Sequence, residues 1–175
     1  MNSKDSVLDR LSVDRLEDSP ISAPISFPSD ACIVHTGIAV GKEETAFAMA
    51  ILDCKGNLIS LASKLTTVLT PHLAEIKALE WATDLIERRG YPRVVWFCDS
   101  QVVVKEVKDS NESNSWFAYN EILNVRHAFA GKQWSLFWTS RNRNLLADLI
   151  AKTTLSSSSV FYFDFCCRDT IPLIF

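Results

Sequence analysis

The order of the apolar segments restricts the fold of this chain more than any other feature of its sequence. Three strand-like segments, near 31–38, 46–52 and 58–65, are separated by short turns, and helical and strand-like segments then alternate. Segment 93–98 (RVVWFC) is apolar at every position after Arg93, as expected of a strand buried on both faces. Hairpins followed by such an alternation predict a mixed sheet with helices packed on it.

The clearest helix is predicted between Thr70 and Gly90. Thr70 is a good N-cap, Pro71 suits the first helical position and Gly90 suits the stop. Further helices are predicted at 100–108, 116–130 and 144–154, with another strand at 133–138. We therefore expect an antiparallel meander of three strands. The strands at 93–98 and 133–138 should extend it in parallel with the first, and 93–98 should lie inside the sheet.

The chain is expected to form one compact domain with an extension at each end. Residues 1–28 are rich in Ser, Asp and Pro and predict a flexible N-terminal segment, residues 30–155 form the domain, and residues 156–175 are an apolar tail that can dock on the sheet or on a partner. No apolar run is long enough to span a bilayer, so we expect no membrane association, and we expect a monomer.

The cysteines and the net charge restrict where the protein can act and what it can bind. The five cysteines are odd in number and lack CxxC spacing, which indicates reduced thiols in an intracellular protein, nuclear or cytoplasmic. The formal net charge of −3 gives no bulk attraction to nucleic acid, so such contact requires a local basic cluster. Arg141 and Arg143, just before the last predicted helix, are the candidates; the alternative is that they are simply solvated in a loop.

Glu75 lies where a soluble domain has little reason to place a carboxylate. On the predicted helix it falls in line with Leu79, Ala82 and Ile86, an apolar stripe, so its side chain should point toward the sheet. The alternative is a favourable interaction of an acid with the positive end of the helix.

Asp99 and Asp148 are two further candidate ligands, and each also has a structural alternative. Asp99 ends the buried strand and can serve as the N-cap of the next helix. Asp148 is inside the last predicted helix and can form an ion pair with Lys152 at i+4. Three acids that converge from separate elements can instead hold divalent metal ions against a phosphodiester. We predict that Glu75, Asp99 and Asp148 cluster within a few ångströms.

These acids lie in strings that resemble ribonuclease H-like domains, and in particular the reverse-transcriptase-like ribonuclease H domains common in plants. The family pattern has DGS on its first strand, and then AEAxALxxAL, xSDSxxVV and HVPRExNxxADxLA. This chain has AILDCKGNLI after its first strand, and then AEIKALEWA, FCDSQVVV and RNRNLLADLIA in the same order, within residues 30–155. The resemblance implies the ribonuclease H-like α/β fold, with a five-stranded mixed sheet of three antiparallel and then two parallel strands, flanked by helices.

The resemblance also implies a function. It implies two divalent ions, Mg²⁺ or Mn²⁺, and hydrolysis of the RNA strand of an RNA–DNA hybrid, with Glu75, Asp99 and Asp148 as three of the four metal-binding acids. Counting back from Asp53, the first acid of the family falls on His35, with Asp30 as the alternative if the first turn is longer.

Two hypotheses follow from this comparison. The first is a metal-dependent endonuclease that acts on hybrids, with impaired activity. The second is a catalytically inactive, mobile-element-derived domain retained for binding nucleic acid or protein. The three acids favour the first hypothesis. His35, and Trp138 at the family's histidine position, favour the second, because imidazole lacks the charge and the bridging oxygen of a carboxylate.

Overall fold

The computed structural model describes residues 27–109 and 116–165. Most of the flexible segment predicted for residues 1–28, residues 110–115, and the last ten residues of the predicted tail lie outside the described residues.

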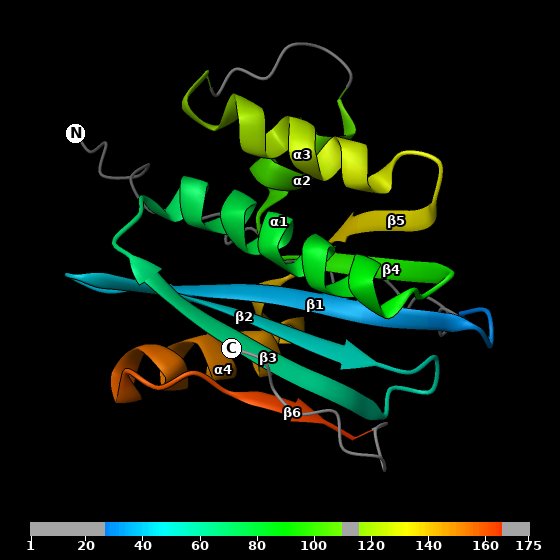
Figure 1. The fold of residues 1–175 in the computed structure, drawn as a ribbon, viewed down its shortest axis with the longest axis horizontal. Helices are drawn as coiled ribbons and strands as arrows, with labels where there is room; N and C mark the ends of the chain where they lie inside the picture. Colours follow the sequence, from blue (N-terminus) through cyan, green and yellow to red (C-terminus); the bar gives the residue numbers. More distant parts are fainter. Residues whose placement is uncertain (1–26, 110–115, 166–175) are drawn as a thin grey trace, which may run out of the picture.

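The sheet has the predicted topology around its first five strands. β1 and β2 pair antiparallel, as do β2 and β3, while β4 runs parallel to β1 and β5 parallel to β4. The strand order is β5-β4-β1-β2-β3-β6, so β4 lies inside the sheet as predicted (Figure 1). The strands are β1 (Ala31–Val40), β2 (Glu44–Leu52), β3 (Leu58–Thr67), β4 (Arg93–Cys98), β5 (Gln133–Trp138) and β6 (Tyr162–Asp164).

The sixth strand corrects the prediction of five. β6 lies within the predicted apolar tail and pairs antiparallel with the outer edge of β3. Arg89, at the end of the long helix, holds it there: its guanidinium pairs with Asp164 at 3.0 Å and donates to the Tyr162 hydroxyl at 2.6 Å. A strand of three residues is too short to show alternation, and these long-range contacts leave no local signal in the sequence.

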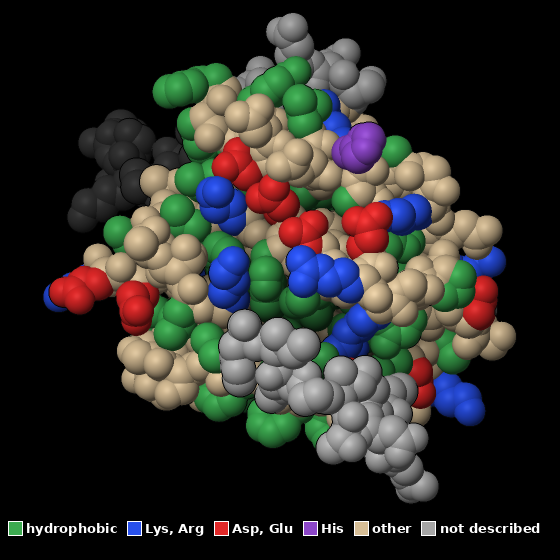
Figure 2. Space-filling view, viewed as in Figure 1, with side chains coloured by type: hydrophobic (Ala, Val, Ile, Leu, Met, Phe, Trp, Pro, Cys, Tyr) green, Lys and Arg blue, Asp and Glu red, His purple; other side chains and the backbone are tan. Residues whose placement is uncertain are grey.

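In the described part of the chain, four α-helices cover the two faces of the sheet unequally. α1, α2 and α3 lie on one face and α4 lies on the other (Figure 1). Acidic and basic side chains mix on the side shown in Figure 2. The ion pair Lys77–Glu121, at 2.9 Å, joins α1 to α3. The helices are α1 (Pro71–Arg89), α2 (Gln101–Lys108), α3 (Tyr119–Phe129) and α4 (Leu145–Ser157), with 3₁₀ turns at Trp116–Ala118 and Arg141–Arg143.

The ends of α1 follow from its sequence. Pro71 occupies the first turn, and Gly90 ends the helix with φ at 67°, a left-handed conformation in which glycine has no steric penalty. The hydroxyl of Thr70, the N-cap residue, makes no capping hydrogen bond. None of the helices in the described part of the chain is both long enough and apolar enough to cross a membrane.

The larger core lies between the sheet and α1–α3, where Trp96 and Val34 are fully buried together with Leu79 of α1. α4 packs on the opposite face, against β1, β2 and β3. Its approach depends on Gly37, because a Cβ there would lie 2.9 Å from the backbone carbonyl carbon of Ala147. This side of β4 and β5 is left largely uncovered by the described helices.

Candidate active site

Glu75 reaches the sheet from the second turn of α1. The stripe that it shares with Leu79, Ala82 and Ile86 is buried, and Glu75 itself is only 7% exposed. Its Oε2 has no hydrogen-bond partner among the described residues. Burial, and then the charge of and a hydrogen bond with Asp99, raise the pKa of Glu75 to about 8, because both effects disfavour the ionised form. The carboxyl group is therefore protonated at neutral pH.

Asp99 follows β4 and lies beside Glu75. It is not the N-cap of α2: that residue is Ser100, whose Oγ accepts from the amide of Val103 at 3.3 Å. The carboxylate of Asp99 instead accepts from Nε of Arg141 at 3.2 Å. Because the adjacent serine takes the capping role, Asp99 is available to the site.

Cys98 joins the two acids, and sequence reasoning missed it. Single ligand atoms of Glu75, Cys98 and Asp99 all lie within 4.8 Å of one another. Burial raises the pKa of the Cys98 thiol, as does the charge of Glu75, so the sulfur is protonated. Its position was open to inference, since alternation along β4 places it on the same face as the buried Trp96.

Asp148 is not part of this group among the described residues. Its Oδ2 accepts from Lys152 at 2.6 Å, which is the i+4 ion pair that the sequence also allowed. Asp148 nevertheless lies near the site, because its charge helps to raise the pKa of Arg141, after that of Asp99. The structure thus brings Glu75 and Asp99 together, and it pairs Asp148 with Lys152 close enough to Arg141 to act on its charge.

The first strand does not bring His35 to the carboxylates. Its ring stacks on Phe97, with centroids 5.1 Å apart, and its Nδ1 donates to Oδ1 of Asn144 at 3.1 Å. Burial lowers the pKa of His35. Asn144 precedes α4 and also donates to the backbone oxygen of Thr36 at 2.7 Å. His35 therefore faces α4, on the side of the sheet away from Glu75.

Asp30 lies at the opposite end of β4 from the site. It precedes β1 and pairs with Arg93 at 3.3 Å, and Arg93 is the first residue of β4, whereas Asp99 follows that strand's last residue. The β1 side chain that faces the site is Thr36, which is fully buried and whose hydroxyl lies beside the thiol of Cys98. Counting back from Asp53 selects His35, on the face of β1 opposite to Thr36, because a shift of one residue turns every side chain to the other side.

The two candidate arginines point to different places. Arg141 binds Asp99, and its side chain remains 73% exposed. Arg143 lines a groove beside β4 and β5 instead. Only Arg141 is therefore in contact with the carboxylates.

The donor set fits one divalent cation better than two. Glu75 and Asp99 supply carboxylate oxygens, the hard ligands that Mg²⁺ and Mn²⁺ prefer, and Oε2 of Glu75 is buried without a hydrogen-bond partner among the described residues. Thr36 adds a hydroxyl but no charge, and Asp148 is held by Lys152. A second ion would lack a bridging carboxylate from β1.

Comparison with known proteins identifies the family. Residues 34–154 match the model of a family described as reverse transcriptase-like. The chain belongs to this family. The match spans all of the elements that build the site, from β1 to α4. None of the curated protein sequences that were compared matches the chain.

Solved structures show the same fold. The ribonuclease H1 of the halophilic archaeon Halobacterium salinarum superposes with a TM-score of 0.67 at 20% identity, over 73% of this chain and 98% of that one. LC11-RNase H1, isolated from compost and solved with an RNA/DNA hybrid, gives 0.66 at 17%, over 73% and 98%. The foamy viral protease-reverse transcriptase, also solved with an RNA/DNA hybrid, gives 0.59 at 14%, over 76% and 21%. The chain therefore has the ribonuclease H-like fold.

Proposed function

We propose that this chain is a ribonuclease H-type domain that binds RNA–DNA hybrids and hydrolyses their RNA strand slowly, with a divalent cation. The observation that carries the proposal is the carboxylate pair. Glu75 and Asp99, from different elements, have ligand atoms within 4.8 Å, and the buried Oε2 of Glu75 has no hydrogen-bond partner in the described residues. A buried carboxyl oxygen without a hydrogen-bond partner is costly in a purely structural role, so a ligand is the better explanation.

Glu75 and Asp99 would hold the cation, and Asp148 would support it from α4 after releasing Lys152. When bound, a divalent ion polarises a phosphoryl oxygen and makes bound water a better nucleophile. Arg141, which is exposed and beside Asp99, would bind and orient a substrate phosphate. The buried Thr36 and Cys98 would exclude water from the inner side of the pair.

We expect slow hydrolysis because Thr36 provides a hydroxyl where a carboxylate would hold the cation more strongly. A hydroxyl in place of a carboxylate removes one negative charge and one bridging oxygen, and each ~1.4 kcal/mol of lost transition-state stabilisation costs tenfold in rate. Mn²⁺ tolerates irregular ligand sets better than Mg²⁺, so cleavage should be detected more readily with Mn²⁺.

Two proteins with a similar fold support the choice of an RNA–DNA hybrid as substrate. LC11-RNase H1 and the foamy viral enzyme were both solved with RNA/DNA hybrids. Hybrid duplexes expose 2′-hydroxyls in a wide, shallow minor groove, so recognition by shape and phosphate contacts needs no base sequence. Association should then weaken strongly with added salt.

The alternative function is binding without cleavage. It is favoured by the same Thr36 and by Arg141, whose guanidinium sits on Asp99 where a cation would be expected. In that case the domain keeps a nucleic-acid surface and does not turn over substrate.

Cleavage of an end-labelled hybrid in Mg²⁺ and in Mn²⁺ tests the proposal. Thr36→Asp should raise the rate at least roughly tenfold, because it restores a carboxylate opposite Glu75. His35→Asp is the matched control: it adds the same charge one residue away, on the other face, and should not raise the rate. Asp99→Asn should abolish cleavage. If Thr36→Asp binds hybrid but never cleaves it, even with Mn²⁺, the alternative function holds.

A further inference from the structure

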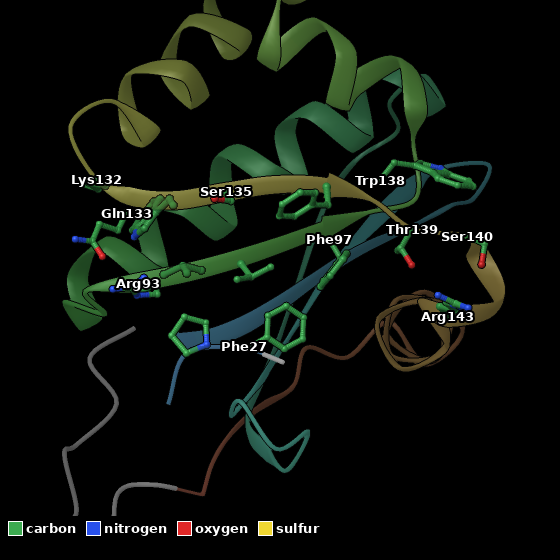
Figure 3. A pocket seen from close by; sticks show the side chains of 15 residues that line it. Phe27, Arg93, Phe97, Lys132, Gln133, Ser135, Trp138, Thr139, Ser140 and Arg143 are labelled. Carbon is green, nitrogen blue, oxygen red and sulfur yellow. The ribbon is translucent and has the colours of Figure 1, made fainter. Parts of the chain in front are cut away.

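A groove of about 990 Å³ lies on the side of β4 and β5 that α4 leaves uncovered (Figure 3). It is separate from the carboxylate pair but adjacent to it. Trp138, at the end of β5, lines the groove, and its Nε1 donates to the backbone oxygen of Asp99 at 3.1 Å. From there the groove follows the two strands to Arg93 and Lys132 at their other ends, a distance of about 20 Å for six strand residues.

The floor of the groove is a row of aromatic rings. Phe27 meets Phe97 with centroids 6.4 Å apart, and Phe97 meets Phe137 at 6.0 Å. Phe137 and Trp138 are 45% and 46% exposed. Large apolar rings at a surface are costly unless something covers them, and a row of rings at this spacing offers faces on which planar groups can stack.

The charge of the groove is of one sign. Its lining contains Arg93, Lys132 and Arg143 and no acidic side chain, although the whole chain is negatively charged. Arg143 forms no ion pair with any other described residue, while Arg93 pairs with Asp30 and Lys132 pairs with Glu87 outside the lining. The mixed charges over α1 and α3 in Figure 2 show no such bias.

We propose that this groove binds single-stranded nucleic acid, as an unpaired extension of the duplex held at the carboxylate pair. Exposed aromatic rings combined with cations and no acids are the features that bind single strands, because every base has a face to stack and every nucleotide a phosphate to neutralise. An apolar peptide would use the rings but would leave Arg143 without an anionic partner among the described residues. The proposal rests on the proposed function for the duplex part only.

Fluorescence anisotropy in EDTA, which prevents cleavage, tests the groove. Three labelled ligands are compared: a blunt RNA–DNA hybrid, the hybrid with a single-stranded DNA extension, and the hybrid with a single-stranded RNA extension. At least one extension should tighten binding about tenfold, since base–aromatic stacking of one or two bases has that effect. The two extensions show whether the groove prefers DNA or RNA.

Phe137→Leu should remove most of the gain from the extension and leave affinity for the blunt hybrid unchanged. Phe163→Leu is the matched control, because Phe163 is similarly exposed, at 52%, but lies on β6 at the opposite edge of the sheet. If Phe137→Leu does not fold, Arg143→Gln provides the second test. It should lower the salt dependence of binding to the extended hybrid by about one ion.

The proposal is overturned if neither extension tightens binding, if Phe137→Leu keeps the whole gain, or if the salt dependence of Arg143→Gln is unchanged. It is also overturned if the protein self-associates and Phe137→Leu abolishes this, because a second copy then fills the groove. The two proposals fail separately. Loss of blunt-hybrid binding, with Phe137-dependent binding of a free single strand, would remove the proposed duplex substrate and keep the groove.

Discussion

The pH dependence of folding offers a direct test of the environment of Glu75. An acid whose pKa is higher in the folded than in the unfolded state holds its proton more tightly when folded, so stability falls as the pH rises between the two values. For Glu75 this window runs from its ordinary value of 4.5 to about 8. Below the window both states are protonated, and above it both are ionised, so the loss is complete near pH 8.

The size of the effect follows from the pKa. Moving it from 4.5 to about 8 corresponds to about 5 kcal/mol of unfolding free energy. Water that enters at the edge of the site when Glu75 ionises reduces this figure, so it is an upper limit. Even half of it would be a large part of the ~5–15 kcal/mol by which domains are stable.

Glu75→Gln removes the ionisation and keeps the shape. Its unfolding free energy, measured in urea from pH 4 to pH 9, should equal that of the unaltered protein near pH 4.5 and exceed it increasingly toward pH 8. Subtracting the two curves cancels the other titrating groups. Asp84→Asn, which changes an exposed acid on the same helix, is the control and should leave the slope as it was.

A divalent ion should reverse the effect in the unaltered protein. Mn²⁺ favours the ionised form of Glu75, so it should stabilise the protein at pH 8 and very little at pH 5. In Glu75→Gln, Mn²⁺ should not stabilise the protein at either pH. Parallel curves for the two proteins without metal would refute the argument, because they would show that ionising Glu75 costs the fold nothing.

Three further predictions concern the framework. Gly37→Ala should destabilise the protein by about 1–3 kcal/mol, since the new methyl group would meet the backbone of Ala147 and push α4 off the sheet; an unchanged melting temperature would contradict this. Asn144→Ala should cost about 1–3 kcal/mol in urea denaturation, because it leaves a β1 carbonyl and a buried imidazole without their partner. Arg89→Met should speed amide hydrogen exchange in β6 and not in β1, and equal protection in β6 would show that its contacts are unimportant.

The fold could be predicted because its elements are marked by local signals. Short turns separate the first three strands, Pro71 and Gly90 mark the ends of α1, and an uninterrupted apolar run marks β4 as an interior strand. β6 could not be predicted, because it is not marked by local signals. It exists through its pairing with β3 and through Arg89, more than seventy residues away, and neither contact leaves a local pattern.

The candidate site was less accessible because it depends on register. The two retained acids, Glu75 and Asp99, are fixed by a helix stripe and a strand end, which are both local. The residue opposite them depends on which face of β1 each side chain occupies, and counting back from Asp53 across β2 and one turn gave His35. Aligning Gly37 with the glycine of the DGS pattern gives Thr36 instead, and this choice also continues the alternation of Cys32 and Val34, which are buried against α1.

The three acids are each neutralised in a different way in the absence of a cation. Glu75 keeps its proton, Asp99 is paired with Arg141, and Asp148 is paired with Lys152. A metal ion that uses all three must therefore displace one proton and two basic side chains. Arg141 and Lys152 are exposed to solvent, so breaking the ion pairs Arg141–Asp99 and Lys152–Asp148 costs little free energy. Removing the proton from Glu75, in contrast, is costly below pH 8. Metal affinity should thus be limited by Glu75, and it should rise by nearly tenfold for each unit of pH up to about 8.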